Sequence, residues 1–440
     1  MHEASDLGVS CDKVTERRTT SYVRTRFWMS PVNRHKILND PVYGFVTLRH
    51  SRALDLMDHR YVQRLRRISQ LGLSHLVYPG AVHNRFHHAV GCMHLMQEAI
   101  ESLRAKGVAI TEAEAEAACL AILLHDVGHG PFSHALEHSI VQGVTHEDIS
   151  ALIMGRLNDE LGGALDLAME IFNDHHPKPF LHQLVSSQLD MDRLDYLARD
   201  SFYSGVTEGK VGSERILKML NVVDGQLVVE EKGIYSIEKF IVARRLMYWQ
   251  VYLHRTVLSA EHMLMLVLRR AKHLAKSGVP VFASPALSLF LHDDLDRAKF
   301  LADPEVLERF CDLDDSDIFV AMKAWRHHDD RVLSLLSARL LDRALFRIEL
   351  RPEPFSEAEV LERKAATAAH FGLTLDDADF MVSNARIDNK AYVPRGILVL
   401  YKNGDIRDFA EANDHLNLQL LSKPVEKSFL CYAKDVPGTP

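Results

Sequence analysis

The sequence has few cysteines for its length and no long apolar run. The five cysteines, at positions 11, 92, 119, 311 and 431, lie far apart and form no Cys-x-x-Cys motif. This spacing argues against a disulfide framework and a thiolate zinc site, and it fits a reducing cytosol. The apolar run at 263–268 ends at two arginines and is too short to span a membrane. The N-terminus lacks the charged-then-apolar order of a signal peptide, so we expect a cytoplasmic protein without membrane partners.

The chain also lacks a positive net charge. Its formal charge of −8 argues against a generic surface for nucleic acid, which we do not expect as a partner. Histidine is the residue in excess, with 25 copies. Because histidine titrates near neutral pH and is the commonest metal ligand, this excess directs attention to a metal site.

The periodicity predicts a mostly α-helical protein with short β-hairpins. At 440 residues the chain can form a large core and a second, smaller lobe. We expect a flexible N-terminal arm at 1–33, either without a role or contacting a partner subunit. A helical core with a helical extension follows at 34–351, and a small α+β lobe at 352–440. The expected elements are a strand at 42–48, hairpins around 224–225 and 403–404, and helices at 58–68, 85–103, 112–125, 131–142, 146 onward, 184–202, 237–276, 285–301, 304–310, 317–324, 328–342 and 356–371.

The stretch 123–134 organises the rest of the chain. An apolar helix at about 117–124 runs into His125 and Asp126, after which Gly128, Gly130 and Pro131 interrupt it. The end of a buried helix therefore delivers an imidazole and a carboxylate side by side. Neither group is stable unpaired in an apolar setting, and a cation would satisfy both.

Residues elsewhere could complete such a site. Arg85 and His88 share a helix face, and Arg85 lies near a helix N-terminus, where the macrodipole disfavours it unless an anion is near. Asp192 shares a face with apolar neighbours, so it requires a partner. Arg244, Tyr248 and Tyr252 recur every four residues. They form either the polar edge of a core helix or a row of donors for phosphate oxygens.

Several other polar residues have simpler interpretations. Arg60, Arg64, Arg66 and Arg67 are expected mainly on a solvated face, with one or two open to phosphate. Asp195 should be either solvated or paired in a salt bridge, for example with Arg199 four residues on. Thr145 is a predicted N-cap with Asp148 as the N3 residue of a capping box, which places His146 at a helix N-terminus. There the helix dipole lowers the imidazole pKa.

The ordered set of His88, His125-Asp126 and Asp192 resembles the HD-domain metal phosphohydrolases. More closely, the sequence is similar to the dNTP triphosphohydrolases related to the vertebrate SAM-and-HD-domain enzyme. The supporting stretches lie at 40–44, 79–86, 125–134, 145–147 and 192–200. The chain departs from that pattern in having no SAM domain and in carrying His87 where relatives often have glutamate. The activator sites of the vertebrate enzyme are not placed, so nucleotide activation is left open.

The resemblance implies roles for individual residues. The metal ligands would be His88, His125, Asp126 and Asp192, holding Mn, Fe, Zn, Ni or Mg, a choice that mixed ligation leaves open. The substrate groups would be Arg85, Arg193, Arg244 and Tyr252 for the triphosphate, Tyr196 near the sugar and Asp200 facing its 3′-hydroxyl. Catalytic roles would fall to His134 with Glu137, which orient the attack, and to His146, which protonates the leaving oxygen. His129 either joins this proton work or simply caps the helix.

These roles predict hydrolysis of a dNTP to deoxynucleoside and inorganic triphosphate. The alternative enzyme is an HD phosphohydrolase acting on a monophosphate, a cyclic nucleotide or an alarmone. An alternative from another class is a nucleic-acid-binding or scaffold protein whose metal serves stability, against which the net acidity counts. Related enzymes are generally oligomers, so we expect a homodimer or homotetramer.

Overall fold

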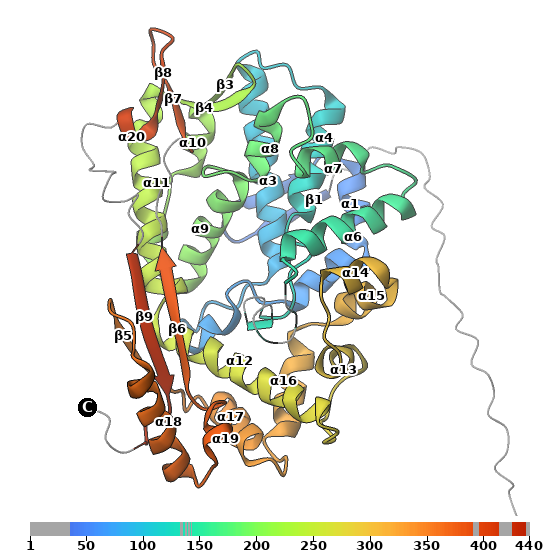
Figure 1. The fold of residues 1–440 in the computed structure, drawn as a ribbon. Coiled ribbons are helices and arrows are strands. Elements are labelled where there is room, and N and C mark those ends of the chain that lie inside the picture. The colour runs from blue at the N-terminus through green and yellow to red at the C-terminus, as the bar shows by residue number, and fades with distance from the viewer. Residues whose placement is uncertain are drawn as a thin grey trace, which may run out of the picture.

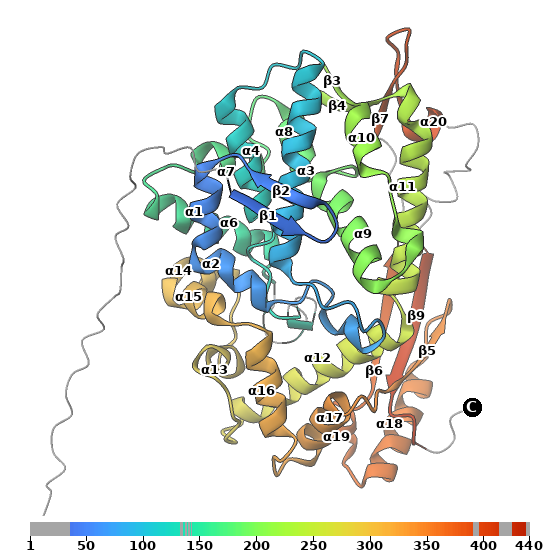
Figure 2. The same cartoon turned by 180° about the vertical axis from the view of Figure 1, so that it is seen from behind.

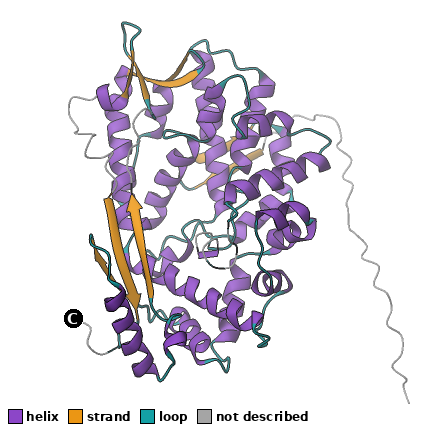
Figure 3. Cartoon of the chain, in the orientation of Figure 1, coloured by secondary structure: helices purple, strands orange, loops and turns teal. Residues whose placement is uncertain are grey.

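Helices dominate the computed structural model, which describes residues 36–132, 135–136, 139, 141, 143–389, 396–412 and 425–436 (Figures 1 and 3). The predicted mostly α fold with small sheets is confirmed. The predicted arm at 1–33 lies outside the described residues, as does most of the helix predicted at 131–142. Within the described chain, no helix is both long and apolar enough to cross a membrane.

Three helices, α3 (Arg85–Ala105), α4 (Glu112–Leu124) and α9 (Met191–Ser204), pack around the centre of the molecule. The predicted apolar end of α4 is its most buried part, since every side chain from Ala117 to Leu124 is shielded from solvent. Thr111 starts α4 through a capping box. The Thr111 hydroxyl accepts from the Glu114 backbone amide at 3.2 Å, and the Glu114 carboxylate accepts from the Thr111 backbone amide at 2.8 Å. The cap fixes where α4 begins, and the helix ends at Leu124, before Gly128 and without a positive-φ glycine.

A β-hairpin and a broken helix precede α3. Strands β1 (Lys36–Asp40) and β2 (Gly44–Leu48) pair antiparallel beside α3 (Figure 2). The helix predicted at 58–68 is instead two short pieces, α2 (Arg60–Gln63) and the 3₁₀ turn η1 (Arg64–Arg67). Helix α1 (Ser51–Asp58), which was not predicted, precedes them, and η2 (Gly72–Leu76) follows. The break falls at His59, whose backbone is extended and whose ring accepts from the Tyr61 amide at 3.3 Å.

Between α4 and α9 the chain forms α6 (His146–Glu160), α7 (Asp166–Phe172) and α8 (Pro179–Val185). The capping box predicted at the start of α6 is confirmed, because the Thr145 hydroxyl accepts from the Asp148 amide at 3.2 Å. The helix predicted from 184 begins only at Met191. Asp190 starts it by accepting from the Arg193 amide at 2.7 Å.

The predicted hairpin around Asp224-Gly225 is confirmed. Strands β3 (Leu220–Val223) and β4 (Gln226–Glu230) pair antiparallel, and both turn residues have positive φ, as a type I′ turn requires. The long helix predicted at 237–276 is divided into α11 (Ile234–Met247), the π-helical turn η5 (Tyr248–Tyr252) and α12 (Arg255–Lys276). A π turn changes the register of side chains along a helix and is frequent at functional sites.

The remaining elements form the helical extension and the C-terminal part. They are η3 (Thr207–Gly209), α10 (Ser213–Met219), η4 (Glu231–Gly233), α13 (Pro285–His292), α14 (Arg297–Ala302), α15 (Pro304–Asp312), α16 (Asp315–Trp325), α17 (Arg331–Leu341), β5 (Arg347–Arg351), α18 (Glu357–Phe371), α19 (Leu375–Ala378), β6 (Ser383–Asn389), β7 (Leu398–Leu400), β8 (Ile406–Asp408), α20 (Phe409–Ala412) and β9 (Val425–Tyr432). One sheet has the order β5-β9-β6. The other has the order β3-β4-β7-β8, in which β7 from the C-terminal part pairs parallel with β4 of the core.

Candidate metal and phosphate site

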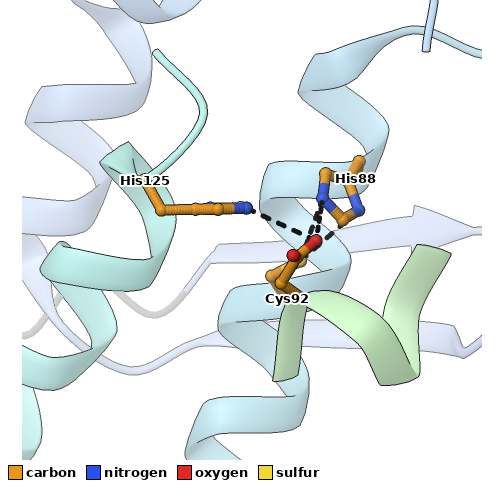
Figure 4. Close-up of side chains that lie close together, drawn as sticks. His88, Cys92 and His125 are labelled. Carbon is orange, nitrogen blue, oxygen red and sulfur yellow. Dashed lines mark hydrogen bonds and ion pairs between the residues drawn. The ribbon is translucent and has the colours of Figure 1, made fainter. Parts of the chain in front are cut away.

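The four predicted metal ligands converge. His88 lies in the first turn of α3, His125 caps the end of α4 with Asp126 beside it, and Asp192 is the second residue of α9. The Nε2 atom of His88 is 3.0 Å from Asp192 Oδ1 and 3.7 Å from Asp126 Oδ2. The Nε2 atom of His125 is 3.3 Å from Asp126 Oδ1 and 3.6 Å from Asp192 Oδ1. Figure 4 shows the His125 ring reaching across from α4 towards α3.

The protonation pattern of this cluster fits a cation. The Nδ1 atom of His125 lies 2.7 Å from the Ile122 carbonyl oxygen, so it must carry the proton and donate it. Its buried Nε2 then makes no hydrogen bond to any described residue, although it faces two carboxylates. Two carboxylates beside imidazole lone pairs repel unless a positive charge lies between them. Two nitrogens and two carboxylate oxygens are a donor set that suits a divalent metal.

The electrostatics of the protein alone agree with this assignment. Burial would lower the pKa of His88, but contacts with Cys92, Asp192 and Asp195 hold it well above its usual value. Burial would likewise raise the pKa of Asp192, but His125 and His88 lower it below its usual range. The cluster therefore attracts positive charge, which protons provide when no metal does.

Cys92 is a neighbour that the sequence did not reveal. Its sulfur lies 3.4 Å from His88 Nδ1, one helical turn along α3, and close to the donor atoms of His125 and Asp192. Burial raises the pKa of this thiol well above its usual value. Its i, i+4 spacing from His88 was the available signal, but a single cysteine in a helix carries little weight without the fold.

On the other side of Asp126 lie an arginine and two stacked histidines. The Arg85 Nη1 atom donates to Asp126 Oδ2 at 2.5 Å, and His129 Nε2 is 3.2 Å from Asp126 Oδ1. The rings of His129 and His146 stack with centroids 3.9 Å apart and planes at 16°. One donor atom each of Asp126, His129 and His146 lies within 4.8 Å of the others, so this group could also hold a cation. Burial and Arg85 hold the pKa of His129 well below its usual value, so it is neutral.

The predicted catalytic pair His134 and Glu137 lies outside the described residues. Their roles therefore stay predictions. His146 is described, and its Nε2 is 3.2 Å from Glu147 Oε1 at the N-terminus of α6.

The predicted phosphate-binding arginines lie beside a cluster of tyrosines. Arg193 donates through Nε to the Ser187 carbonyl at 2.6 Å and to Asp190 Oδ2 at 3.2 Å. Arg244 has a buried Nε without a hydrogen-bond partner among the described residues, and its guanidinium lies 5.8 Å from the Tyr248 ring. Burial raises the pKa of Tyr196 above its usual range, while Arg244 and Arg193 oppose that rise. Both guanidinium groups thus act on one tyrosine, which lies on α9 a turn after Asp192.

Asp200 and Tyr252, predicted to contact the sugar and the triphosphate, bond to each other. The Tyr252 hydroxyl donates to Asp200 Oδ2 at 2.7 Å, and His83 Nε2 lies 2.8 Å from Asp200 Oδ1. Tyr252 also meets Tyr196 edge to face, with centroids 6.1 Å apart. The π turn η5 thus presents Tyr252 towards α9. His83, which the sequence left without a role, completes this group.

The prediction that the arginines at 60–67 lie mainly on a solvated face is wrong for Arg64. It is buried, and its guanidinium donates to three carbonyl oxygens, of Val127 at 3.0 Å, His129 at 2.7 Å and Leu313 at 3.2 Å. Two of these carbonyls belong to the turn that follows Asp126. Arg66 and Arg67 are exposed, as predicted.

Comparison with known proteins agrees with this geometry. Residues 85–200 match the HD domain model, and residues 211–282 match the HD associated region. A crystal structure of a phosphohydrolase from Bacteroides thetaiotaomicron is 54% identical and covers 91% of this chain and 100% of its own, with a TM-score of 0.88.

Two sequence relatives extend the comparison. The uncharacterized protein YwfO of Bacillus subtilis is 33% identical over 392 residues, covering 86% of this chain and 88% of its own length. A deoxynucleoside triphosphate triphosphohydrolase SAMHD1 homolog of Dictyostelium discoideum is 32% identical over 250 residues, or 52% of this chain and 48% of that protein. With the four ligands assembled between α3, α4 and α9, the chain belongs to the HD-domain phosphohydrolase family.

Proposed function

We propose that the chain hydrolyses deoxynucleoside triphosphates to a deoxynucleoside and inorganic triphosphate. The observation that carries this proposal is the set of arginines near the predicted ligands: Arg85 bonds to Asp126, and Arg193 and Arg244 both lower the pKa of Tyr196, one turn after Asp192. Guanidinium forks pair with phosphate oxygens two bonds at a time, and a triphosphate offers more such oxygens than a monophosphate. The printed name of the Dictyostelium relative supports the same substrate class.

His88, His125, Asp126 and Asp192 would hold a divalent cation of unassigned identity. When bound, such a cation supplies a Lewis acid next to a phosphoryl oxygen. Arg85 is tied to Asp126, so it holds its guanidinium at the edge of the ligand set. Its buried Nε has no partner among the described residues and is available to a phosphate oxygen. Arg85 and Arg244 then orient the chain of phosphates along the cluster.

The histidine stack supplies the proton chemistry of the proposal. His129 is buried and neutral, and it contacts Asp126, while His146 is more accessible at 26% side-chain exposure. We assign His146 to donate a proton to the leaving 5′-oxygen. The pair His134 and Glu137 would orient the attack at the α-phosphorus. A positioned proton donor typically contributes about 10²–10⁴ to the rate.

The Asp200–Tyr252 pair is assigned to the sugar. Asp200 is held by the Tyr252 hydroxyl and His83, so its carboxylate is fixed in orientation. A fixed acceptor can receive a hydrogen bond from the sugar 3′-hydroxyl. The ring of Tyr196, packed against Tyr252, would crowd a 2′-hydroxyl and favour deoxyribose.

The test is a panel of dNTPs with the purified, metal-analysed protein and identification of products by ion-exchange chromatography. We expect intact inorganic triphosphate and free deoxynucleoside. Release of orthophosphate or pyrophosphate instead would contradict the proposal and favour the alternative HD phosphohydrolase. Turnover of a monophosphate, a cyclic nucleotide or an alarmone with no turnover of any dNTP would do the same. Light scattering on that sample tests the proposed dimer or tetramer.

A further inference from the structure

The ring nitrogen of His88 that faces away from the cluster is held by a buried carboxylate. His88 Nδ1 lies 2.7 Å from Asp195 Oδ2, and Asp195 is fully buried. The Arg199 guanidinium donates hydrogen bonds to both oxygens of Asp195, from Nε to Oδ2 and from Nη2 to Oδ1, each at 2.9 Å. The predicted salt bridge between these two residues is therefore confirmed. Neither member has any exposed side-chain surface, which the sequence did not predict.

The same arginine reaches a third charged residue, distant in sequence. Arg199 Nη1 donates to Asp40 Oδ2 at 2.8 Å, and the Asp40 side chain is only 4% exposed. The other oxygen of Asp40 accepts from the backbone amides of Val42 and Tyr43 at 2.9 and 3.0 Å. Asp40 ends strand β1, so the contacts run without a gap from the β1–β2 turn through Arg199 and Asp195 to the predicted ligand His88.

Gly91 gives an independent indication that helix α3 is built around this pair. A Cβ atom at Gly91 would lie 1.9 Å from Asp195 Oδ1 and 2.2 Å from Arg199 Nη2. Glycine inside a helix is unfavourable by roughly 0.5–1 kcal/mol relative to alanine. A glycine in the second turn of α3 therefore has a specific use, which is to let the Asp195–Arg199 pair approach the backbone one turn from His88.

The arrangement fixes which nitrogen of His88 faces the cluster. Asp195 accepts a hydrogen bond from the Nδ1–H group, so the lone pair stays on Nε2, the atom 3.0 Å from Asp192. Arg199 keeps Asp195 charged in its buried position, and Asp40 balances Arg199. The three residues together place one net negative charge behind the imidazole, which strengthens it as a ligand.

We propose that Asp40 and Arg199 are positioning residues of the metal centre, acting through Asp195 on His88. This rests on the metal-dependent function proposed above, but it needs only that the cluster binds a cation. It makes the turn of the β1–β2 hairpin part of the metal site, although Asp40 contacts no ligand. Removing Asp40 should weaken metal binding roughly 10-fold or more, the effect typical of lost outer-shell partners.

The test measures the affinity of the full-length protein for cobalt(II), by its visible absorption and by competition with a chelator. We expect Asp40→Asn to lower the affinity at least 10-fold, and Arg199→Lys, which loses the fork directly on Asp195, to lower it at least as much. Asp330→Asn is the matched control, because Asp330 pairs with Arg270 at 2.6 and 3.0 Å in another buried fork far along the chain. It should lower thermal stability without changing cobalt affinity.

The outcomes separate this inference from the proposed function. An Asp40→Asn protein that binds cobalt within twofold of the unaltered protein would overturn the inference, whatever its stability. Should Asp40→Asn fail to fold, Gly91→Ala applies the same test, since its methyl group must displace Asp195 or Arg199. Weakened cobalt binding in these variants would uphold the inference even if no dNTP is turned over, because the measurement involves no nucleotide.

Discussion

The two sides of the His88 ring differ in how their charges are satisfied. Behind the ring, Asp195, Arg199 and Asp40 pair with one another at 2.8–2.9 Å. In front of it, the Nε atoms of Arg85, Arg244 and the Nε2 atom of His125 are buried without hydrogen bonds to any described residue. Paired buried charges hold a geometry, whereas unpaired donors cost free energy until a ligand satisfies them. The difference indicates which side holds the ligands in place and which side receives the substrate.

The largest expected effect comes from replacing Asp126, whose carboxylate contacts four residues of the site: His88, His125, His129 and Arg85. Asp126→Asn should abolish turnover and reduce metal affinity by more than the roughly 100-fold that bounds outer-shell changes. Circular dichroism should show the fold retained, with Asp294→Asn, an exposed carboxylate, as the control. If the unaltered protein shows no turnover and Asp126→Asn only lowers its melting temperature, the metal is structural and the open side receives no substrate.

The next largest effect is expected on substrate binding, at a buried nitrogen that makes no hydrogen bond to any described residue. Arg244→Ala should raise KM for a dNTP about 10–100-fold, because a charge-assisted hydrogen bond contributes about 1.5–3 kcal/mol. Steady-state kinetics of Arg245→Ala, on the next residue of α11, supplies the control and should match the unaltered protein. Equal KM values for all three proteins would remove Arg244 from the phosphate site.

A third substitution tests buried groups that are fully paired but lie away from His88. Arg64→Met leaves three buried carbonyls without their donor, so the free energy of unfolding should fall by about 3 kcal/mol in urea titrations. Arg66→Met, on the exposed neighbour, should change it by less than about 1 kcal/mol. Similar small losses in both variants would show that the turn after Asp126 holds its shape without Arg64.

The smallest effect concerns Glu261 on α12, whose carboxylate lies close to Gly72. Burial raises the pKa of Glu261 to about 7. Because the folded state keeps this proton and the unfolded state releases it, the stability of the protein should fall as pH rises from about 4.5 to about 7. Glu261→Gln should therefore be more stable than the unaltered protein by roughly 2 kcal/mol at pH 8, a gain that disappears at pH 4.5.

Urea titrations across this pH range measure the effect. Glu214→Gln, an exposed glutamate, is the control and should show no such pH dependence. A Glu261→Gln gain that stays constant with pH would mean that the carboxylate is not desolvated.

Local patterns singled out three of the four predicted metal ligands, whereas His88 was added by the family resemblance. His125-Asp126 ends an apolar helix, and Asp192 lies on the buried face of another. The salt bridge predicted between Asp195 and Arg199 is confirmed, but its burial was not predicted, because i, i+4 spacing describes only a pair on an isolated helix. Their burial depends on Asp40, 159 residues from Arg199, and on the space that Gly91 leaves. No local pattern predicts those contacts.

Element boundaries failed for similar reasons. In the region predicted as one helix at 58–68, the His59 ring caps the start of a new helix. The helix predicted from 184 begins only after Asp190, whose side chain caps it. The π turn η5 keeps an apolar period close to that of an α-helix, so periodicity alone could not separate α11 from α12. The roles of His134 and Glu137 stay predictions.

The parallel pairing of β7 with β4 has a practical consequence for anyone who shortens this chain. A fragment ending near residue 351 would keep α3, α4 and α9 with the four predicted ligands. It would lose β7, the strand that pairs with β4. An uncovered strand edge recruits other strands. Such a fragment should therefore self-associate and precipitate, and its loss of solubility should not be mistaken for a defect in the catalytic helices.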